Sequence, residues 1–516
     1  MFNATRRGFL KGVAGVTALG ASGCICSRGC GDNRIRLAVV GVMGKGYSDW
    51  TPMLKTGLVK IVAFCDCDYS MRRKAQMALI RDGIDFDMSQ VPFYTDYRRL
   101  LDDADLLGIQ AMTVSTTDHT HAPIAIPAMQ KGIHVYVQKP LVRTLWENDY
   151  FKRTAQENNV IVQMGNQGSS LDEFRRAVDV LNTGILGDVT EVHVWTNRPV
   201  WPQGKSAAEA TKGDADGIPE GFNWNAWLST AADRPFKGAY KPGKKGYDPW
   251  GICSNVYHPF SWRGFFDFGC GAFGDMACHT MNLPFRGLEL GVVSSAKLKL
   301  IEDKTDVAFP MKSVVVLTYA ARESKVRPGV TLPAVDLTWY DGDCKPSAEI
   351  MPQVVAKIGK VPNTGCVLIG SKGILCSTND YGGESFIALK GEKEVVNILE
   401  REDCKAIASV TPVCAAATSK GDGTVSVEMK GFAEGHYGEF LNAIKGVGPV
   451  YKSTHSRCYS DIDFTIPIME SVLVGVVAQR VASVDTVLDW DSTKQQFAQV
   501  KANEFLKPYI RKGFEF

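Results

Sequence analysis

Residues 34–46 read Arg-Ile-Arg-Leu-Ala-Val-Val-Gly-Val-Met-Gly-Lys-Gly, an apolar run that leads directly into a glycine-rich turn. A short apolar run of this kind is typical of a strand buried on both faces of a parallel sheet. Gly41 and Gly46 occupy the first and third glycine positions of the pattern G-x-G-x-x-G, and Met43 takes the second. Glycine lets the chain turn sharply and lets its amides approach a pyrophosphate. The candidate phosphate-binding residues are therefore Gly41, Gly44, Lys45 and Gly46.

An acidic residue follows the second expected strand at the spacing that a bound dinucleotide requires. Residues 59–65 form an apolar run that ends at Asp66, 25 residues after Gly41. A carboxylate there can accept hydrogen bonds from both hydroxyls of an adenosine ribose, and it would repel a 2′-phosphate. Asp66 therefore predicts NAD rather than NADP as the cofactor. Two alternatives stay open: Asp68 is the ribose partner, or Asp66 only forms a turn.

Strand, loop and helix patterns recur through this part of the chain. Further apolar strands are expected at 107–115, 133–137 and 160–164, with a helix at 122–131. The alternation predicts an α/β Rossmann-type fold, a doubly wound parallel sheet, over residues 31–165. Polar residues cluster after the carboxyl ends of the strands, where ligands bind in such sheets. The further candidates for cofactor binding are Thr116, Asp118, His121, Gln138, Lys139 and Asn166.

Strand patterns of a different kind follow in residues 166–435. Alternating or β-branched segments predict strands at 189–195, 313–319 and 334–340, and residues 366–376 resemble a hairpin. These patterns suit an α+β second domain with a mostly antiparallel open sheet and long loops. The expected segments are a leader (1–30), the first domain (31–165), the second domain (166–435), and a C-terminal segment (436–516) with helices at 436–445 and 465–484 that packs back on the first domain.

The composition excludes several classes of protein. The 516 residues are 45% hydrophobic and 22% charged, which suits a folded chain of about two domains. Lys and Arg number 58 and Asp and Glu 56, and the resulting net charge of +2 does not support a dedicated nucleic-acid binder. The sequence has no apolar run of about 18 residues, so a membrane-spanning helix is not expected. Because it has no Cys-x-x-Cys pair, and its histidines lack ligand-like spacing, no metal site is expected.

The first 30 residues resemble an export leader. Arg6 and Arg7 precede Phe-Leu-Lys and a short apolar stretch at 12–23 that is rich in glycine and alanine. A paired arginine before a weak apolar region is the pattern of twin-arginine export, which predicts a periplasmic protein. Cys24 follows Ala-Ser-Gly, so a lipoprotein anchored to the membrane at this cysteine is the alternative destination. A soluble amphipathic N-terminus is the other interpretation of the same residues.

Several motifs spread along the chain form one recognisable set. They are Gly41–Gly46, Asp66, Asp118–His121, Gln138–Pro140, Met164–Gln167, Thr196–Pro199, Trp262–His279, Leu488–Asp491 and Tyr509–Phe514. On these motifs the chain resembles the Gfo/Idh/MocA oxidoreductase family, in its exported bacterial branch. The resemblance implies bound NAD, a sugar or sugar-derivative substrate, and a homo-oligomer. One position departs from the family pattern: this chain has Gln138-Lys139-Pro140 where Glu-Lys-Pro is usual, which puts either the nicotinamide contacts or the pKa of the lysine in doubt.

Lys139, Asp275 and His279 are the candidate catalytic residues. Residues 269–274 are expected to form a loop and Asp275 to begin a helix, so Asp275 and His279 share one helix face. Oxidising an alcohol needs a base for the hydroxyl proton, and histidine suits this role because its ordinary pKa is about 6.5. Lys139 can hydrogen-bond the reacting oxygen, and Asp275 a neighbouring hydroxyl. The resemblance implies that the three share one site; the alternative for the Asp/His pair is a surface helix contact.

Aromatic residues gather in and around residues 202–260, a long segment with little periodicity. Loops of this length are usually functional or mobile. The tryptophans of this region either stack on sugar rings or simply pack the loops. They are Trp201, Trp224, Trp227, Trp250 and Trp262. The candidate substrate-binding residues are Arg198, Trp201, Trp262 and Arg263, with Tyr257 and Asp267 as further contacts.

These expectations define three candidate functions. The first is an NAD-dependent oxidoreductase that acts on a sugar hydroxyl by hydride transfer and holds its cofactor tightly, because outside the cytoplasm no obvious pool re-oxidises free NADH. The alternative is an NAD-dependent glycosidase. There, transient oxidation at sugar C3 acidifies the C2 proton, permits elimination of the aglycone, and is reversed after water adds. The third is a non-catalytic sugar-binding lipoprotein. The sequence does not reveal which sugar or which carbon reacts.

Overall fold

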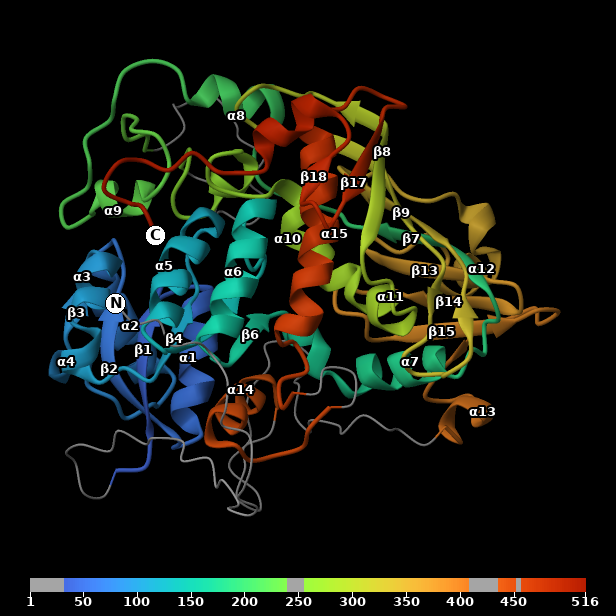
Figure 1. Cartoon of the computed structure of the whole chain (residues 1–516), viewed down its shortest axis with the longest axis horizontal. Helices are drawn as coiled ribbons and strands as arrows, with labels where there is room; N and C mark the ends of the chain where they lie inside the picture. The colour runs from blue at the N-terminus through green and yellow to red at the C-terminus, as the bar shows by residue number, and fades with distance from the viewer. Residues whose placement is uncertain (1–31, 239–254, 408–434, 452–455) are drawn as a thin grey trace, which may run out of the picture. The chain divides into compact units, whose positions relative to one another are not determined.

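A parallel sheet flanked by helices forms the first part of the computed structural model (Figure 1). The structure describes residues 32–238, 255–407, 435–451 and 456–516. Within these residues, six parallel strands follow the order β3-β2-β1-β4-β5-β6, the order of a dinucleotide-binding sheet. The predicted Rossmann-type sheet is therefore confirmed. Its strands are β1 (Ile35–Val40), β2 (Val59–Cys65), β3 (Phe93–Tyr94), β4 (Ala111–Val114), β5 (His134–Gln138) and β6 (Val162–Gly165).

The helices of this part begin and end at residues that differ from the predicted bounds. The fourth strand is shorter than the predicted 107–115 because a short helix ends at Gly108, which adopts a left-handed conformation with φ of 58°. The next helix begins at Asp118, before the predicted 122, and this acid suits the positive end of the helix dipole. The helices are α1 (Lys45–Lys55), α2 (Ser70–Arg81), α3 (Tyr97–Asp102), α4 (Ala104–Leu107), α5 (Asp118–Gln130) and α6 (Leu145–Glu157).

A second sheet of ten strands is seen in the described part of the chain, in the order β16-β15-β14-β13-β7-β12-β9-β8-β17-β18. Its pairs are antiparallel except for β7 with β12, so the predicted mostly antiparallel sheet is confirmed. The strands are β7 (Val189–Trp195), β8 (Val293–Glu302), β9 (Lys312–Tyr319), β12 (Val335–Asp341), β13 (Gly365–Gly370), β14 (Gly373–Ser377), β15 (Ser385–Leu389), β16 (Val396–Asn397), β17 (Val487–Asp491) and β18 (Gln496–Phe497), with β10 (Arg322–Glu323) and β11 (Thr331–Leu332) as a separate pair.

Two buried helices lie between the sheets (Figure 1). Helix α15 (Ile462–Val481) packs on α6, β8 and α10 (Gly271–Thr280). It has the length and apolar composition to span a membrane, but 83% of its most apolar window is buried in the protein, as a core helix would be. Helix α10 begins within residues 269–274, which the sequence predicts as a loop. A Cβ on Gly271 would lie 2.6 Å from the Phe309 ring, so this glycine permits close packing.

The segment between β7 and β8 extends to the first domain, and we call its described residues 204–238 and 255–268 the insertion. It holds α8 (Gly204–Ala210) and α9 (Trp224–Leu228) around a cluster of buried aromatic residues. The rings of Trp224 and Trp227 stack with centroids 4.7 Å apart. The unpatterned loops predicted here are thus held together by an aromatic core, while Trp250 lies outside the described residues.

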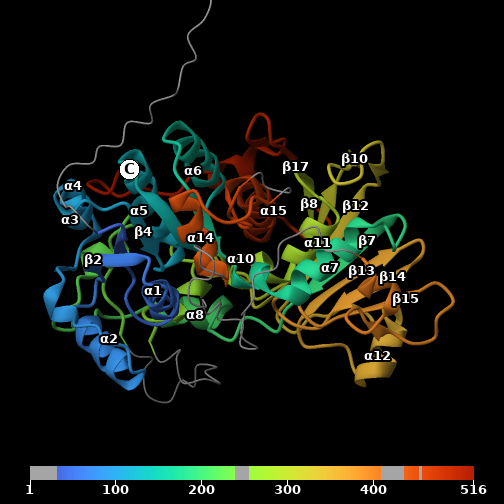
Figure 2. The same ribbon diagram turned by 90° about the horizontal axis from the view of Figure 1, so that it is seen from below.

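The C-terminal part of the chain contacts the first domain and also contributes strands to the second sheet. Helix α14 (Gly435–Lys445) packs on α1 of the first domain (Figure 2), whereas β17 and β18 extend the second sheet. The expected C-terminal segment, 436–516, therefore serves both parts of the fold, and the domain boundaries stay predictions. The remaining helices are α7 (Asp172–Asn182), α11 (Asn282–Gly287), α12 (Pro352–Ile358) and α13 (Glu402–Lys405).

Candidate active site

A cavity of about 450 Å³ lies at the carboxyl ends of β1, β2 and β4. Strands β1 and β4 are neighbours at which the strand order reverses, the position where parallel sheets of this order bind ligands. The volume is in the usual range for a small-molecule site. The sequence-predicted residues that line it are Gly41, Gly44, Lys45, Asp66, Thr116, Trp262 and Arg263.

The glycine turn has the shape that a bound phosphate chain requires. Gly41 has a φ of 83°, in the left-handed region, and a Cβ on Gly46 would lie only 2.0 Å from the Gly41 carbonyl oxygen. Gly44 directly precedes α1, and nothing lies within 4 Å of the place its Cβ would take. Gly44 and Lys45 line the cavity, so the start of α1, whose first amides lack partners within the helix, can hold an anion there. The main chain of this turn fits the pyrophosphate of NAD.

Asp66 lines the cavity, whereas Asp68 turns away from it. The Val42 amide donates to Asp66 Oδ2 at 3.0 Å, and the Asp68 amide donates to Asp66 Oδ1 at 3.1 Å. Asp68 itself accepts the Ser70 amide at the start of α2. Burial raises the pKa of Asp66 to about 6, although its two backbone hydrogen bonds oppose the shift. Of the two candidate acids, Asp66 is the one placed to meet a ribose.

The insertion closes the cavity on its other side. The Asn223 amide donates to the Cys67 carbonyl at 2.7 Å, and the hydroxyls of Tyr97 and Ser229 are hydrogen-bonded at 2.8 Å. These bonds join the insertion to the first domain on the side of Asp66. Sequence patterns did not link this segment to the cofactor, yet several of its side chains line the same cavity as the glycine turn. They include Trp227, His258, Pro259 and Phe260.

Lys139 and Asp275 meet in a buried ion pair. Lys139 Nζ donates to the Asp275 carbonyl oxygen at 2.8 Å and to Oδ1 at 2.9 Å, and the two side chains are only 16% and 14% exposed. Arg263 Nε lies 3.3 Å from the same Oδ1, and the Arg263 guanidinium lies over the Trp262 ring. Burial alone would raise the pKa of Asp275, but Lys139 and Arg263 hold it well below its ordinary value. Since Arg263 also lines the cavity, this pair lies beside the cavity's end.

His279 lies one turn after Asp275 on α10. Its buried ring faces the edge of the Tyr381 ring at 5.0 Å, and its Nδ1 has no hydrogen-bond partner among the described residues. Burial lowers the pKa of His279 well below its ordinary value, and the positive charge of Lys139 lowers it further. The imidazole is therefore neutral at physiological pH, the form that can accept a proton.

Asp118 joins helix α5 to the start of α10. Its Oδ2 accepts the Cys270 amide at 3.1 Å. Burial raises the pKa of Asp118 to about 7, and the charge of Arg263 opposes this shift. Predicted as a cofactor-binding residue, Asp118 instead braces the helix that carries Asp275 and His279, and it does not line the cavity.

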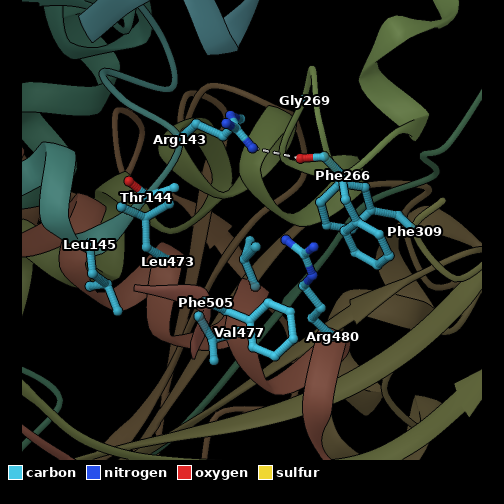
Figure 3. A pocket seen from close by; sticks show the side chains of 11 residues that line it. Arg143, Thr144, Leu145, Phe266, Gly269, Phe309, Leu473, Val477, Arg480 and Phe505 are labelled. Carbon is cyan, nitrogen blue, oxygen red and sulfur yellow. Dashed lines mark hydrogen bonds between the residues drawn. The ribbon is translucent and has the colours of Figure 1, made fainter. Parts of the chain in front are cut away.

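A second brace holds the loop that precedes α10 (Figure 3). Arg143 Nη1 donates to the Phe266 carbonyl at 2.7 Å, and the Arg480 guanidinium lies over the Phe266 ring at 4.7 Å. These groups surround a cavity of about 20 Å³, enough for about one water molecule. Arg143 follows the Lys139 segment and Phe266 precedes the Asp275 helix, so this contact fixes the two halves of the ion pair relative to each other.

Other predicted cofactor residues do not line the cavity and contact residues near it instead. His121 Nδ1 is hydrogen-bonded to the Pro140 carbonyl at 2.8 Å and so braces the Lys139 loop. Gln138 donates to Asp49, a buried acid that no sequence pattern singled out. The side-chain amide of Asn166 is fully buried and lacks a partner within the residues described.

The remaining predicted substrate residues lie outside the cavity. Trp201 is buried, and its Nε1 donates to Gln203 at 2.8 Å, so its ring packs within the protein and is not available for stacking in this structure. Arg198 Nη2 lies 3.6 Å from Asp380. Tyr257 belongs to the buried aromatic cluster of the insertion, and Asp267 pairs with Arg234.

The first domain also matches known proteins in sequence. A family model described as "Oxidoreductase family, NAD-binding Rossmann fold" (GFO_IDH_MocA) matches residues 35–166. A glycosyl hydrolase family 109 protein of Akkermansia muciniphila is 27% identical over 163 residues, 30% of this chain and 32% of the relative. The levoglucosan dehydrogenase of Pseudarthrobacter phenanthrenivorans is 34% identical over 113 residues, 21% of this chain and 28% of the relative. The chain thus spans about a third or less of the length of these curated relatives.

Solved structures extend the likeness to the fold of both domains. An inositol dehydrogenase homologue of Azotobacter vinelandii, solved with NADH and myo-inositol, superposes with a TM-score of 0.53 at 16% identity. The superposition covers 89% of this chain and 98% of that one. Fold and glycine turn together define a two-domain protein with an NAD-binding first domain. Within it, residues 35–166 are similar to the NAD-binding Rossmann fold of the GFO_IDH_MocA oxidoreductase family.

Proposed function

We propose that this protein is an oxidoreductase that holds NAD tightly and removes hydride from a hydroxyl-bearing carbon of a sugar or sugar derivative. The buried Lys139–Asp275 pair carries this proposal. It lies beside the NAD cavity, and the neutral imidazole of His279 lies one turn further along the helix that carries Asp275 and interacts electrostatically with both charges. Two stretches of chain, 136 residues apart, supply an ammonium and a carboxylate in direct contact.

The proposed roles follow from these contacts. Bound NAD supplies the hydride acceptor. His279 takes the hydroxyl proton as the carbon–oxygen bond becomes a carbonyl. Lys139 donates a hydrogen bond to the reacting oxygen and stabilises its negative charge. Asp275 holds the Lys139 ammonium in place and can accept a hydrogen bond from a neighbouring hydroxyl.

Tight retention of NAD is supported by the insertion. The hydrogen bonds of Asn223 and of Tyr97 with Ser229 join the insertion to the first domain beside Asp66. A cofactor that lies between the glycine turn and Trp227 must break such contacts to leave. A cofactor that stays bound must be re-oxidised in place, either by a second substrate or by returning its hydride to the same molecule.

A sugar substrate and export complete the proposal. The inositol dehydrogenase homologue and the levoglucosan dehydrogenase support a polyol or sugar hydroxyl as the reacting group. The Arg6-Arg7 leader supports twin-arginine export to the periplasm, with a lipid anchor at Cys24 as the alternative; both lie outside the described residues. We also propose that the protein forms a homo-oligomer, as the resemblance implies.

The second candidate function is an NAD-dependent glycosidase. One observation favours it: the similarity to a glycosyl hydrolase family 109 protein. It needs the same first step at C3 and the same retained cofactor, so the residues of that first step do not separate it from a net oxidation.

Absorbance measurements on the purified full-length protein separate the candidates. The protein is incubated with myo-inositol, with levoglucosan and with nitrophenyl glycosides, and the near-ultraviolet band of reduced nicotinamide is recorded. A band that appears with a sugar marks oxidation; release of nitrophenol without a lasting band marks the glycosidase. If neither appears with these compounds or with a wider panel of sugars and polyols, both enzyme functions are wrong. The Lys139→Met variant is the control, because it keeps the cavity lining and should lose either signal.

A further inference from the structure

Asp49 is a fully buried carboxylate with side-chain partners from several parts of the fold. Its Oδ1 lies 3.0 Å from Lys45 Nζ and accepts the Tyr437 hydroxyl at 2.8 Å. Its Oδ2 accepts the Ser115 hydroxyl at 2.7 Å and Gln138 Nε2 at 2.9 Å. A buried carboxylate is stable only when ionic and hydrogen-bonding partners surround it, and each oxygen here has at least two. The Gln167 side-chain amide also lies 3.4 Å from Oδ1.

The partners of Asp49 belong to the parts that build the cofactor site. Lys45 lies in the glycine turn, and Ser115 follows β4 and lines the cavity. Gln138 ends β5 immediately before Lys139, and its Oε1 accepts the Lys139 amide at 3.3 Å. Because Asp49 can only accept hydrogen bonds, it fixes the Gln138 amide with its nitrogen toward α1 and its oxygen toward Lys139.

The same contacts explain why glutamine stands at position 138. A glutamate of the same shape would place a carboxylate oxygen about 2.9 Å from Asp49 Oδ2. Two carboxylates at that distance cannot both ionise, so one would have to bind a proton or move away. The negative charge beside Gln138 is thus supplied by Asp49 on α1, and not by a carboxylate at the end of β5, the strand that precedes Lys139.

We propose that Asp49 is a positioning residue, which supplies a carboxylate where α1 meets the carboxyl ends of β4 and β5. It positions the Lys45 side chain directly, and it positions the Lys139 backbone through the Gln138 amide. Its effect on cofactor binding depends only on the NAD-binding domain. Its effect on turnover rests on the proposed function.

Moving the charge between the two positions tests the proposal. The variants are Asp49→Asn, Gln138→Glu and the double variant, each purified as the full chain and measured for melting temperature and for NADH affinity by fluorescence. We expect Gln138→Glu to lower the melting temperature. Each single variant should weaken NADH binding at least about tenfold, since losing one hydrogen bond to a charged group usually changes an equilibrium by that much. The double variant should recover toward the wild type in both measurements.

Gln163→Glu is the matched control. Gln163 is another buried glutamine of the same sheet, and its Nε2 donates to the His436 carbonyl at 2.6 Å rather than to Asp49. Adding Asp49→Asn to Gln163→Glu should therefore give no recovery. Recovery in that control would show a general effect of removing a buried charge and would overturn the proposal.

The double variant decides the outcome even if Gln138→Glu fails to fold. A double variant that melts no higher than Asp49→Asn alone, and binds NADH no better than that variant, would overturn the role of Asp49. Where a substrate has been found, kcat should fall in Asp49→Asn and recover in the double variant, with KM little changed. NADH affinity and melting need no turnover, so a failure of the proposed enzymatic function would be seen separately from a failure of this inference.

Discussion

Asp66 should make NAD binding depend on pH. Its carboxylate lines the cofactor cavity, and burial raises its pKa to about 6. The ionised form is the one that accepts hydrogen bonds from ribose hydroxyls, and these bonds favour ionisation in the complex. NAD affinity should therefore be full above about pH 7 and should be lost as the pH falls through the pKa of the free protein.

The size of the effect follows from that pKa. One pH unit below it, at about pH 5, roughly one carboxyl group in eleven is ionised, so NAD affinity should be about tenfold weaker than its plateau at neutral pH. In the variant Asp66→Asn, which cannot ionise, affinity should be weaker at neutral pH and nearly flat across the same range. A buried charge is removed at the same time, so the variant without cofactor should be at least as stable as the wild type at neutral pH.

Calorimetric titration of NAD from about pH 5 to about pH 8 measures both curves. Two other groups could contribute: His258 lines the cavity and has a pKa lowered to about 4 by burial, and Asp118 has a pKa raised to about 7. Both remain in Asp66→Asn, so any part of the pH dependence that they cause persists there. A pH dependence that is the same in the variant and the wild type, or an unchanged affinity at neutral pH, would remove Asp66 from the ribose site.

Three further substitutions probe separate parts of the site. Lys139→Met should lower the rate of NADH formation by about a hundredfold or more while NAD affinity by calorimetry stays the same, and an active variant would exclude Lys139 from the chemistry. Gly46→Ala should weaken NAD binding by about tenfold or more, because the new Cβ overlaps the Gly41 carbonyl oxygen at 2.0 Å; wild-type affinity would contradict the close approach. Tyr97→Phe removes the 2.8 Å hydrogen bond to Ser229 and should speed NAD release about two- to tenfold in a dilution assay, with unchanged release arguing against closure by the insertion.

The elements that local sequence patterns describe well were predicted well. Strand β7 was expected at 189–195 and is found at Val189–Trp195, but its burial does not alternate: Thr190 and Glu191 are exposed and the other five residues are buried. Strand β8 was missed, although its sequence also alternates. It pairs with β9, the next strand along the chain, with two register shifts, and with β17, almost 200 residues further along the chain. The predicted start of helix α10 was too late in the chain. Gly271 favours a loop in the sequence, but in the structure it begins the helix and packs against the Phe309 ring.

The parts of the site that lie within one short stretch of sequence could be predicted. The contacts between residues distant in the chain could not. The glycine turn, Asp66 and the Asp275–His279 spacing are each contained in a short stretch of sequence. The direct contact of Asp275 with Lys139 and the closure by the insertion depend on tertiary packing. Asp49 had no signal at all, because an acid in the first turns of a helix usually faces solvent or complements the helix dipole.

The same contacts bear on the choice between the two proposed reactions. Both begin with removal of a hydride and a hydroxyl proton, which needs one base, and His279 can serve. The glycosidase must then remove the C2 proton as well, which requires a second base. Asp118 is a buried acid that interacts electrostatically with Asp275 and Lys139, but its Oδ2 accepts the Cys270 amide and holds the start of α10. Elimination would require Asp118 both to brace this helix and to exchange a proton, whereas a simple oxidation leaves it as a brace, and for this reason we rank the oxidoreductase first.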